Sequence, residues 1–201
     1  MPRSAIVVGA GLCGLVAADG LARAGISTTV LDKGRAPGGR LSTRRDGDAR
    51  WDHGAQFFTV RDPRFEKTVE EWCASGVATE WCRGFGGASD GHPRFRGTPG
   101  MSAIGRHLAR DLDVRTGVRV SSIAPVVPGG TGGAVESIGG SGTHSPETRW
   151  RVALEATDGD DRAEPRAIEA DALVLTAPVP QSLALLDTGA TALAPTDRAA
   201  L

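Results

Sequence analysis

The sequence contains no tyrosine, only three cysteines and no apolar run long enough to span a membrane. Cys13, Cys73 and Cys82 are too few and too widely spaced for a disulfide framework or a four-ligand zinc site. The N-terminal stretch MPRSAIVVGAGLCG is too short and too interrupted by glycine for a signal peptide. We therefore expect a cytoplasmic protein with reduced thiols and no membrane partner.

An excess of charge of either sign is also missing, since 23 Lys and Arg face 24 Asp and Glu. This balance excludes the broad positive electrostatic potential with which proteins bind nucleic acid nonspecifically. The acidic DGDD at 158–161 is predicted to be a hairpin turn, because a calcium loop needs regularly spaced oxygens and a terminal Glu. No metal site is expected, and His92, His107 and His144 receive no chemical role.

The first 34 residues have the pattern of a β-α-β unit. SAIVVG at 4–9 predicts a buried parallel strand, and LCGLVAADGLARA at 12–24 has apolar residues at helical spacing, with Gly25 as the stop. STTVLDKG at 27–34 predicts the second strand. With 201 residues, the chain can bury one sizeable core or two small ones.

Three glycines between the first strand and the helix fit the G-x-G-x-x-G pattern of dinucleotide-binding proteins. Gly9 permits the tight turn, Gly11 lets backbone approach a diphosphate, and Gly14 lets the helix pack closely on the strand. Asp32 follows at the spacing of a ribose-binding acid and disfavours a 2′-phosphate. Cys13 is expected to be a small buried packing residue. The predicted cofactor-binding residues of this unit are Gly9, Gly11, Leu12, Cys13, Gly14, Asp32 and Lys33.

The rest of the chain predicts shorter elements. WDHGAQFFTVRD has strand-like content, and residues 63–75 and 100–112 have apolar residues at helical spacing. Trp72 and Trp81 are expected to be core residues. Two short strands are expected in DVRTGVRVSSIAPV, and a flexible Gly-rich loop or insertion at 128–146. RWRVALEA and AIEADALVLTAPVP flank an acidic turn like the arms of a hairpin, and a last helix is expected over QSLALLD.

The first unit alone leaves FAD and NAD open, and the residues after it favour FAD. RAPGGRLSTRR resembles the glycine-pair motif of amine oxidase-type flavoproteins, which implies that Gly38, Gly39 and Arg40 run under the FAD diphosphate and the flavin edge. An Arg fork suits phosphate, and a glycine pair allows close passage of the chain. Arg44 and Arg45 are either a solvated pair or ligands of a phosphate or an acidic substrate.

Further motifs resemble the renalase family, from residue 4 to about residue 187, with only 128–146 departing as an insertion. These motifs are DHGAQFFTVRD, GTPGMSAIGRHLARDL, GVRVSSI, RWRV and ADALVLTAPVPQSLALL. The resemblance implies an α/β fold with an FAD-binding Rossmann-type β-α-β domain and a partial antiparallel or mixed-sheet substrate domain, truncated at the C-terminus. The implied division is 1–60 for the Rossmann unit, 61–100 for part of the substrate domain, 101–187 for the return to the FAD-binding domain, and 188–201 for a tail.

The same resemblance assigns roles by position. Asp52 and the residues after it would line the isoalloxazine, Val120 would contact the adenine end, and 176–178 would close over the ribityl or flavin side. His53 and Gln56 are the candidate catalytic residues, although His53 could be a structural histidine and Gln56 could only orient its loop. The implied FAD contacts are His53, Gly54, Ala55, Gln56, Val120, Thr176, Ala177 and Pro178.

The implied reaction is hydride transfer from a dihydronicotinamide isomer of NAD(P) to the flavin N5 of noncovalent FAD, with oxygen as acceptor. Such a transfer needs no side-chain base, which agrees with the lack of a Ser-His-Asp or paired-carboxylate pattern. An amine oxidase or desaturase of the same superfamily is the alternative. Family members are longer and carry a later Gly-Asp motif, so the chain is expected to be either a fragment of such an oxidoreductase or a non-catalytic dinucleotide-binding remnant.

Overall fold

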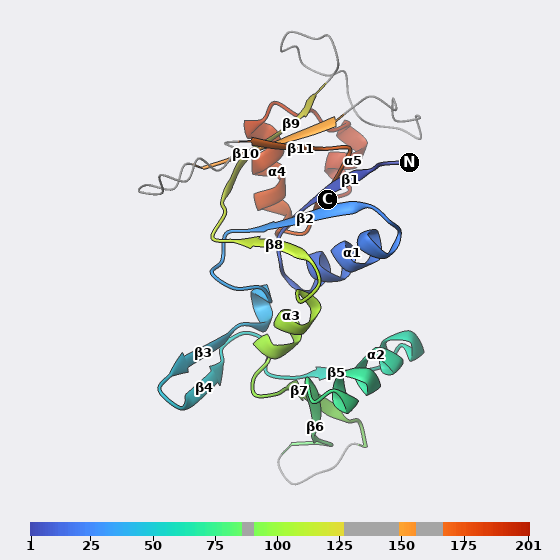
Figure 1. Ribbon diagram of the computed structural model, residues 1–201, viewed down its shortest axis with the longest axis vertical. Coiled ribbons are helices and arrows are strands. Elements are labelled where there is room, and N and C mark those ends of the chain that lie inside the picture. Colours follow the sequence, from blue (N-terminus) through green and yellow to red (C-terminus); the bar gives the residue numbers. More distant parts are fainter. Residues whose placement is uncertain (86–90, 127–148, 156–166) are drawn as a thin grey trace.

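The computed structural model describes residues 1–85, 91–126, 149–155 and 167–201. They form an elongated molecule in which a parallel sheet lies between a three-stranded sheet at one end and another at the opposite end (Figure 1). The described strands are β1 (Ser4–Val8), β2 (Ser27–Asp32), β3 (Thr43–Asp46), β4 (Ala49–Asp52), β5 (Phe58–Thr59), β6 (Ala78–Cys82), β7 (Arg94–Gly97), β8 (Asp113–Thr116), β9 (Val120–Val126), β10 (Arg149–Leu154), β11 (Ala167–Ala170) and β12 (Ala172–Leu175). The described helices are α1 (Leu12–Arg23), the 3-10 helix η1 (Gly39–Leu41), α2 (Pro63–Ala74), α3 (Ser102–Leu108), α4 (Val179–Thr188) and α5 (Pro195–Ala199).

The parallel sheet has the strand order β12-β1-β2-β8 and confirms the β-α-β unit. The central strand β1 is a continuous apolar run after Ser4 because both of its faces are buried, whereas its neighbour β2 is apolar and buried only at Val30 and Leu31. Ile6, Val8 and Leu31 pack on one face, while Val7 and Val30 face the other. The helix α1 ends where the sequence predicts, since Gly25 has φ +78° just after it.

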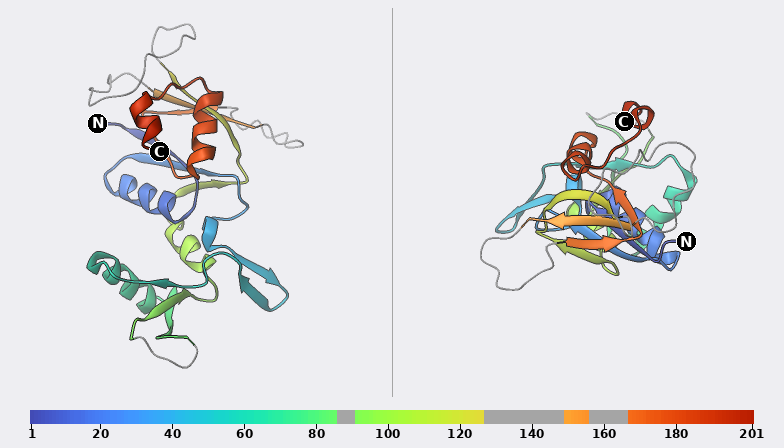
Figure 2. Two further views of the ribbon diagram at one scale, coloured as in Figure 1. Left: turned by 180° about the vertical axis from the view of Figure 1, so that it is seen from behind. Right: turned by 90° about the horizontal axis from the view of Figure 1, so that it is seen from above.

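Different layers cover the two faces of this sheet. On one face, the side chains of α1 and α3 complete the core with Leu15, Ala18 and Leu108. On the other, the antiparallel sheet β11-β10-β9 and helix α4 contribute Ile123, Val152, Ala170 and Leu186. The view from behind shows the same stacking (Figure 2). The result is a layered α/β fold.

The hairpin arms predicted for RWRVALEA and AIEADALVLTAPVP pair as β10 and β11. The second arm then changes sheets, because β12 joins β1 directly after Asp171. The Asp171 carboxylate marks this change by accepting the backbone N–H groups of Arg3 (2.7 Å) and Ser4 (3.1 Å). The predicted loop at 128–146 and turn at 158–161 lie outside the described residues, as does His144. The helix α5 falls in the predicted tail.

The opposite end of the molecule is the sheet β5-β7-β6 with helix α2. Asp62 caps α2 by accepting the backbone N–H of Arg64 at 2.8 Å, and Pro63 begins the helix, as the sequence predicts. Trp72 is a core residue, with 5% of its surface exposed. Trp81 is 47% exposed, so its prediction as a core residue is wrong. A bulge between Glu80 and Cys82 breaks the register of the edge strand β6 at Trp81 and turns that side chain out of the core.

Two other predictions need correction in length. The strand expected over WDHGAQFFTVRD is two short strands, β4 and β5, separated by an irregular segment. The helix expected over 100–112 is regular only from Ser102 to Leu108, followed by turns. The irregular segment between β4 and β5 passes beside Arg40, where Ala55 donates its N–H to the Arg40 carbonyl.

Candidate functional site

The loops that follow β1, β2 and β12 meet at the carboxyl edge of the parallel sheet, where α/β proteins bind ligands. Gly9 has φ +110°, which favours glycine, and donates its backbone N–H to the Leu31 carbonyl at 2.8 Å. The tight turn predicted for the first glycine is therefore confirmed.

Gly14 and Thr176 hold the glycine loop in place. A Cβ at Gly14 would overlap the Gly9 carbonyl oxygen, which confirms the close packing predicted for the third glycine. The Thr176 hydroxyl lies within hydrogen-bonding distance of the carbonyls of Val8 (3.1 Å) and Gly9 (3.2 Å), so it fastens the end of β12 to this loop. This structural role was missed by the sequence analysis, because Thr176 is far from the loop in sequence.

The N-terminus of α1 opens onto the same edge. Gly11 precedes the helix without a side-chain cap, and the Leu15 N–H bonds to the Gly11 carbonyl, so the N–H groups of the first turn remain available to an anion. A Cβ at Gly11 would meet no atom within 4 Å, so open space adjoins the loop. Leu12 is exposed. Cys13 is exposed as well, which corrects its prediction as a buried residue: the buried stripe of α1 is Gly14, Leu15 and Ala18.

Asp32 lies at the end of β2, where the sequence places it, and is half-buried. Its carboxylate joins two loops, because one oxygen accepts the backbone N–H of Ala10 and the other that of Gly34, each at 2.6 Å. Each oxygen has further acceptor capacity for hydroxyl groups. Lys33 is exposed and its ammonium donates to the Gln181 side chain on α4 at 3.3 Å.

The glycine pair crosses the glycine loop at backbone contact distance. Gly38 donates its N–H to the Ala10 carbonyl at 2.8 Å and forms an isolated bridge with Gly11. A Cβ at Gly39 would lie 3.1 Å from the Gly11 Cα, and a Cβ at Gly105 of α3 would lie 2.5 Å from the Gly38 Cα. Where these three backbone segments stack, Gly39 and Gly105 therefore leave no room for a side chain. We call this arrangement of Gly11, Gly38, Gly39 and Gly105 the glycine crossing.

The predicted flavin-side residues follow β4 and pass beside Arg40. Ala55 donates its N–H to the Arg40 carbonyl at 2.9 Å, and a Cβ at Gly54 would overlap the same oxygen. The His53 ring nitrogen Nε2 lies 3.4 Å from the Ser42 hydroxyl, and His53 and Gln56 are both exposed. The structure thus brings the segment 53–56 against the glycine pair.

Asp52 directs its side chain elsewhere. Its Oδ1 accepts the Thr43 hydroxyl at 2.5 Å and the Met101 backbone N–H at 3.0 Å. The Thr43 hydroxyl in turn accepts the Ser102 backbone N–H at 3.0 Å. Asp52 and Thr43 therefore fasten the hairpin β3–β4 to the start of α3.

The last predicted contacts are spread along the edge. Near Asp32, the backbone N–H groups of Gly117 and Val118 donate to the carbonyls of Gly34 (2.7 Å) and Asp32 (3.0 Å). Val120, the predicted adenine contact, begins β9 two residues later and packs its side chain partly into the core. Ala177 and Pro178 follow Thr176 and lead into α4, with Pro178 exposed at its N-terminus.

An aromatic group adjoins the 53–56 segment. The rings of Phe57, Trp81 and Phe85 lie 5.6 to 6.1 Å apart, centroid to centroid, and Trp81 and Phe85 are about half exposed. The Arg94 guanidinium lies 4.7 Å from the Phe85 ring centroid and 5.9 Å from that of Phe57. These rings therefore already accept a cation.

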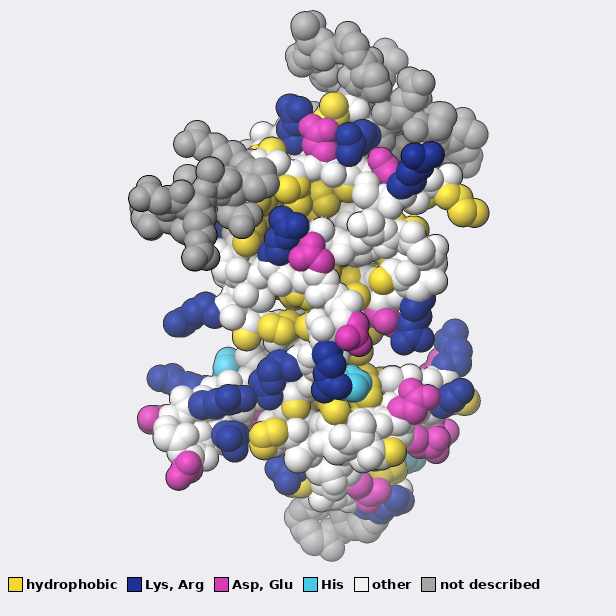
Figure 3. Space-filling view, viewed as in Figure 1, with side chains coloured by type: hydrophobic (Ala, Val, Ile, Leu, Met, Phe, Trp, Pro, Cys, Tyr) yellow, Lys and Arg dark blue, Asp and Glu magenta, His cyan; other side chains and the backbone are white. Residues whose placement is uncertain are grey.

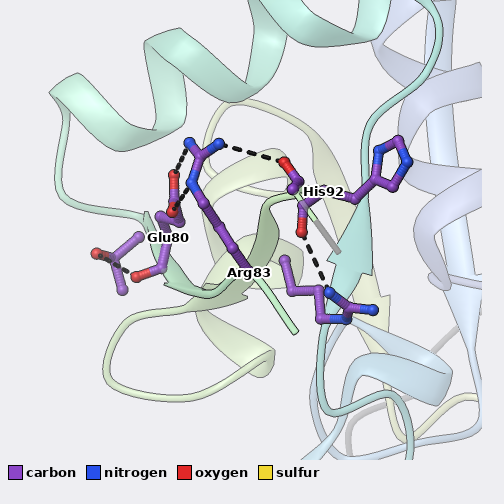
Figure 4. Close-up of polar contacts among 6 residues, drawn as sticks. Glu80, Arg83 and His92 are labelled. Atoms are coloured by element: carbon purple, nitrogen blue, oxygen red, sulfur yellow. Dashed lines mark hydrogen bonds and ion pairs between the residues drawn. The ribbon is translucent and has the colours of Figure 1, made fainter. Parts of the chain in front are cut away.

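A separate cavity of about 580 Å³ lies between α2 and the sheet β5-β7-β6. At its rim, Arg83 forms a two-pronged ion pair with Glu80 (2.7 and 2.8 Å) and donates to the Gly91 carbonyl, while the His92 ring points away (Figure 4). Burial, and then the Glu80 charge, raise the pKa of the Cys73 thiol that lines this cavity. None of the residues assigned to the cofactor line it.

Within the described ranges, no group of three or more His, Cys, Asp or Glu side chains is placed to hold a metal ion. Among these same residues, no helix is long and apolar enough to cross a membrane.

Comparison with known proteins agrees with the fold at this edge. Residues 7–72 match a family described as an NAD(P)-binding Rossmann-like domain. The chain is 38% identical to the L-amino-acid oxidase of Daboia russelii over 71 residues, which are 35% of this chain and 14% of that protein. It is 56% identical to the phytoene desaturase of Neurospora crassa over 71 residues, which are 35% of this chain and 12% of that protein. The matched part thus spans a small share of these curated relatives.

A structural likeness extends further along the chain. The putative protoporphyrinogen oxidase from Exiguobacterium superposes with a TM-score of 0.60 at 13% sequence identity, covering 92% of this chain and 61% of that chain. The chain therefore has an α/β fold with a Rossmann-like dinucleotide-binding unit, as the sequence predicts. The likeness includes the regions on both sides of the parallel sheet, because nearly the whole chain is superposed.

Proposed function

We propose that this chain is the dinucleotide-binding part of an FAD-dependent oxidoreductase of the amine oxidase superfamily. The glycine crossing is the observation that carries the proposal. A Rossmann unit needs only the glycine loop to receive a diphosphate, whereas here a second glycine segment crosses that loop and continues to residues 53–56. A ligand that extends beyond its adenosine end would therefore meet a continuous backbone surface.

The residues present fit FAD. The first turn of α1 offers free N–H groups and a positive helix end to a diphosphate, and the open space beside Gly11 leaves room for it. Asp32 can accept ribose hydroxyls, and Arg40, which follows Gly39 of the crossing, is exposed. Bound FAD supplies a hydride acceptor. The segment 53–56 would line its reactive ring, orient the donor and exclude water.

For the hydride donor, we propose a dihydronicotinamide isomer of NAD(P), with oxygen as the final acceptor. The support is the ordered resemblance of the motifs to the renalase family. The segment 53–56 contains one titratable side chain, His53, whose ring nitrogen Nε2 lies near the Ser42 hydroxyl. A donor whose nitrogen lone pair drives hydride release needs no stronger base.

An amine or related substrate is the second candidate, and the aromatic group favours it. Phe57 directly follows Gln56, and its ring and that of Phe85 already lie near a guanidinium. Aromatic faces of this kind attract alkylammonium groups. One relative is named an L-amino-acid oxidase and another a phytoene desaturase, so an oxidase and a desaturase both occur among similar proteins.

The first experiment is to purify the chain, record its visible spectrum, release any cofactor by heat and identify it by mass. We expect a yellow protein that releases intact FAD, or takes it up on titration. Stopped-flow reduction with dihydronicotinamide isomers and with amines then separates the two candidates. A colourless chain that does not bind added FAD contradicts the proposal and favours a non-catalytic remnant.

Gly11→Ala provides a sharp variant for this test. The added methyl meets no protein atom within 4 Å and Gly11 has φ −73°, so the variant should fold, with a loss of about 1 kcal/mol or less because alanine is a poorer N-cap than glycine. It should nevertheless bind FAD at least about tenfold more weakly, because the methyl enters the space reserved for the diphosphate. Gly20→Ala, in open space on α1, is the matched control and should leave FAD binding unchanged. Equal FAD affinity in all three proteins would show that the space beside Gly11 is not the cofactor site.

A further inference from the structure

The hairpin β3–β4 places two arginines directly opposite each other. Its register pairs Thr43 with Asp52 and Arg45 with Arg50. Opposed residues in an antiparallel pair have Cα atoms about 4.5–5.5 Å apart and share a face of the sheet. Arg45 also shares that face with Thr43, two residues earlier. Arg44, in contrast, points to the other face with Trp51.

The arginine-bearing face looks toward α3. Thr43 and Asp52 on that face accept the backbone N–H groups of Ser102 and Met101 at the start of the helix, each at 3.0 Å. Arg106 lies one turn after Ser102 and donates from Nη1 to the Ser102 hydroxyl at 2.7 Å. Arg106 is therefore on the side of α3 that meets the hairpin, and three guanidinium groups converge from two elements.

These three arginines have no acidic partner among the described residues. No ion pair joins Arg45, Arg50 or Arg106 to a carboxylate in that part of the chain, and Asp52 Oδ1 is already engaged by Thr43 and Met101. Burial lowers the pKa of Arg106 below its ordinary value, and the charges of Arg45 and Arg50 lower it further. Basic side chains gather over the hairpin and α3 on this side of the molecule (Figure 3). Like charges are thus held together where an anion would relieve their repulsion.

We propose that Arg45, Arg50 and Arg106 form a binding site for a phosphate group of a small-molecule ligand. Guanidinium forks match the geometry of phosphate oxygens and remain charged at all working pH values. The site is built into the molecule because the hairpin is fastened to α3 through Asp52 and Thr43. It also adjoins the cofactor region, since β4 leads directly to His53 and Gly105 of the glycine crossing precedes Arg106.

The phosphate can come from the cofactor or from the substrate, and we assign it to the substrate. In the proposed function, the first turn of α1 and the open space beside Gly11 receive the cofactor diphosphate. Only the assignment of the phosphate to the substrate rests on the proposed function. The phosphate site itself is tested without flavin.

The test is calorimetric titration of the full chain with inorganic pyrophosphate at low ionic strength. The double variant R45Q/R50Q removes two charges from exposed side chains without disturbing the hydrogen bonds of Asp52, and R106Q removes the third. The control R61Q/K67Q removes two exposed charges near α2, and circular dichroism and melting verify the fold of each protein. We expect affinity to fall at least about tenfold in R45Q/R50Q and about threefold or more in R106Q, with little change in the control. Absent binding to the wild type, or equal loss in the control, overturns the site.

A second arm distinguishes the two sources. The same titration is repeated on chain saturated with FAD, and FAD affinity is measured for R45Q/R50Q. Unchanged pyrophosphate binding and unchanged FAD affinity support a substrate phosphate. Loss of pyrophosphate binding in the presence of FAD, with weakened FAD affinity in the variant, refutes the substrate assignment in favour of the cofactor. Pyrophosphate binding by a chain that takes up no FAD would keep the phosphate site and reject the flavoenzyme proposal.

Discussion

Replacing Gly105 with alanine sets two known effects against each other. Gly105 lies inside α3, where alanine is favoured over glycine by about 0.8–1 kcal/mol in helix propensity. In this structure, however, the new Cβ would lie 2.5 Å from the Gly38 Cα, 3.0 Å from the Gly38 nitrogen and 3.1 Å from the Pro37 carbonyl oxygen. All three are backbone atoms, so no side chain can rotate away.

The backbone clash is expected to prevail. Overpacking costs typically about 1–3 kcal/mol, and a clash with backbone atoms, which cannot rotate away, belongs at the upper end of that range. Subtracting the helical gain leaves a net destabilisation of about 1–2 kcal/mol, or a fall in melting temperature of roughly 2–8 °C for a chain of this size. Displacement of Gly38 should also weaken FAD binding, because the glycine pair would move away from Gly11.

Gly20→Ala is again the control, since its Cβ meets nothing within 4 Å and it also lies in a helix. We expect it to raise the melting temperature by up to about 2–4 °C. Thermal melting by circular dichroism and chemical unfolding, followed by FAD titration of the same three proteins, measure both effects. If Gly105→Ala is as stable as Gly20→Ala and binds FAD like the wild type, the glycine crossing does not constrain this fold.

Three other predictions concern single side chains. Thr176→Val should destabilise the protein by about 1–2 kcal/mol and Thr176→Ser by less in urea unfolding, because only serine keeps a hydroxyl for the Val8 and Gly9 carbonyls; equal stability of the two variants would contradict the fastening role. FAD should slow alkylation of the exposed Cys13 by iodoacetamide, measured by peptide mass spectrometry, while leaving that of Cys73 unchanged; equal protection of both, or of neither, would be the opposing result. The Arg3 and Ser4 N–H groups lower the pKa of Asp171, so the stabilisation by its carboxylate should be full above its unfolded pKa of about 4 and disappear as pH falls through the folded pKa. In urea unfolding from pH 7 to pH 2, the free energies of unfolding of the wild type and Asp171→Asn should therefore converge. A difference between the two that does not change with pH would exclude this linkage.

The β-α-β unit could be predicted because its signals are local. Apolar runs mark strands buried on both faces, and Gly9, Gly14 and Gly25 occupy positions where a side chain would clash or where φ is positive. The pairing of β10 with β11 was also readable, since both arms flank one acidic turn. The glycine loop of this unit serves FAD and NAD alike, so FAD could be predicted only from the glycine-pair motif that follows it.

The errors arose at residues whose exposure depends on local geometry that their residue type does not show. Trp81 lies in the edge strand β6, where a bulge turns its side chain outward. Cys13 lies in an apolar helix, yet on the side away from the sheet. The sequence also separates Arg45, Arg50 and Arg106, and only the register of the hairpin and its attachment to α3 bring them together.

The position of β1 has a consequence for how the chain reaches this structure. β1 lies between β2 and β12, so Ala5 pairs with a residue as distant as Ala172. During synthesis, one edge of β1 therefore stays unpaired until residues 172–175 have left the ribosome, and the parallel sheet closes late. Sheets with such high contact order fold slowly and expose aggregation-prone strand edges on the way. Expression yield should consequently depend strongly on temperature and on chaperones that shield nascent apolar segments.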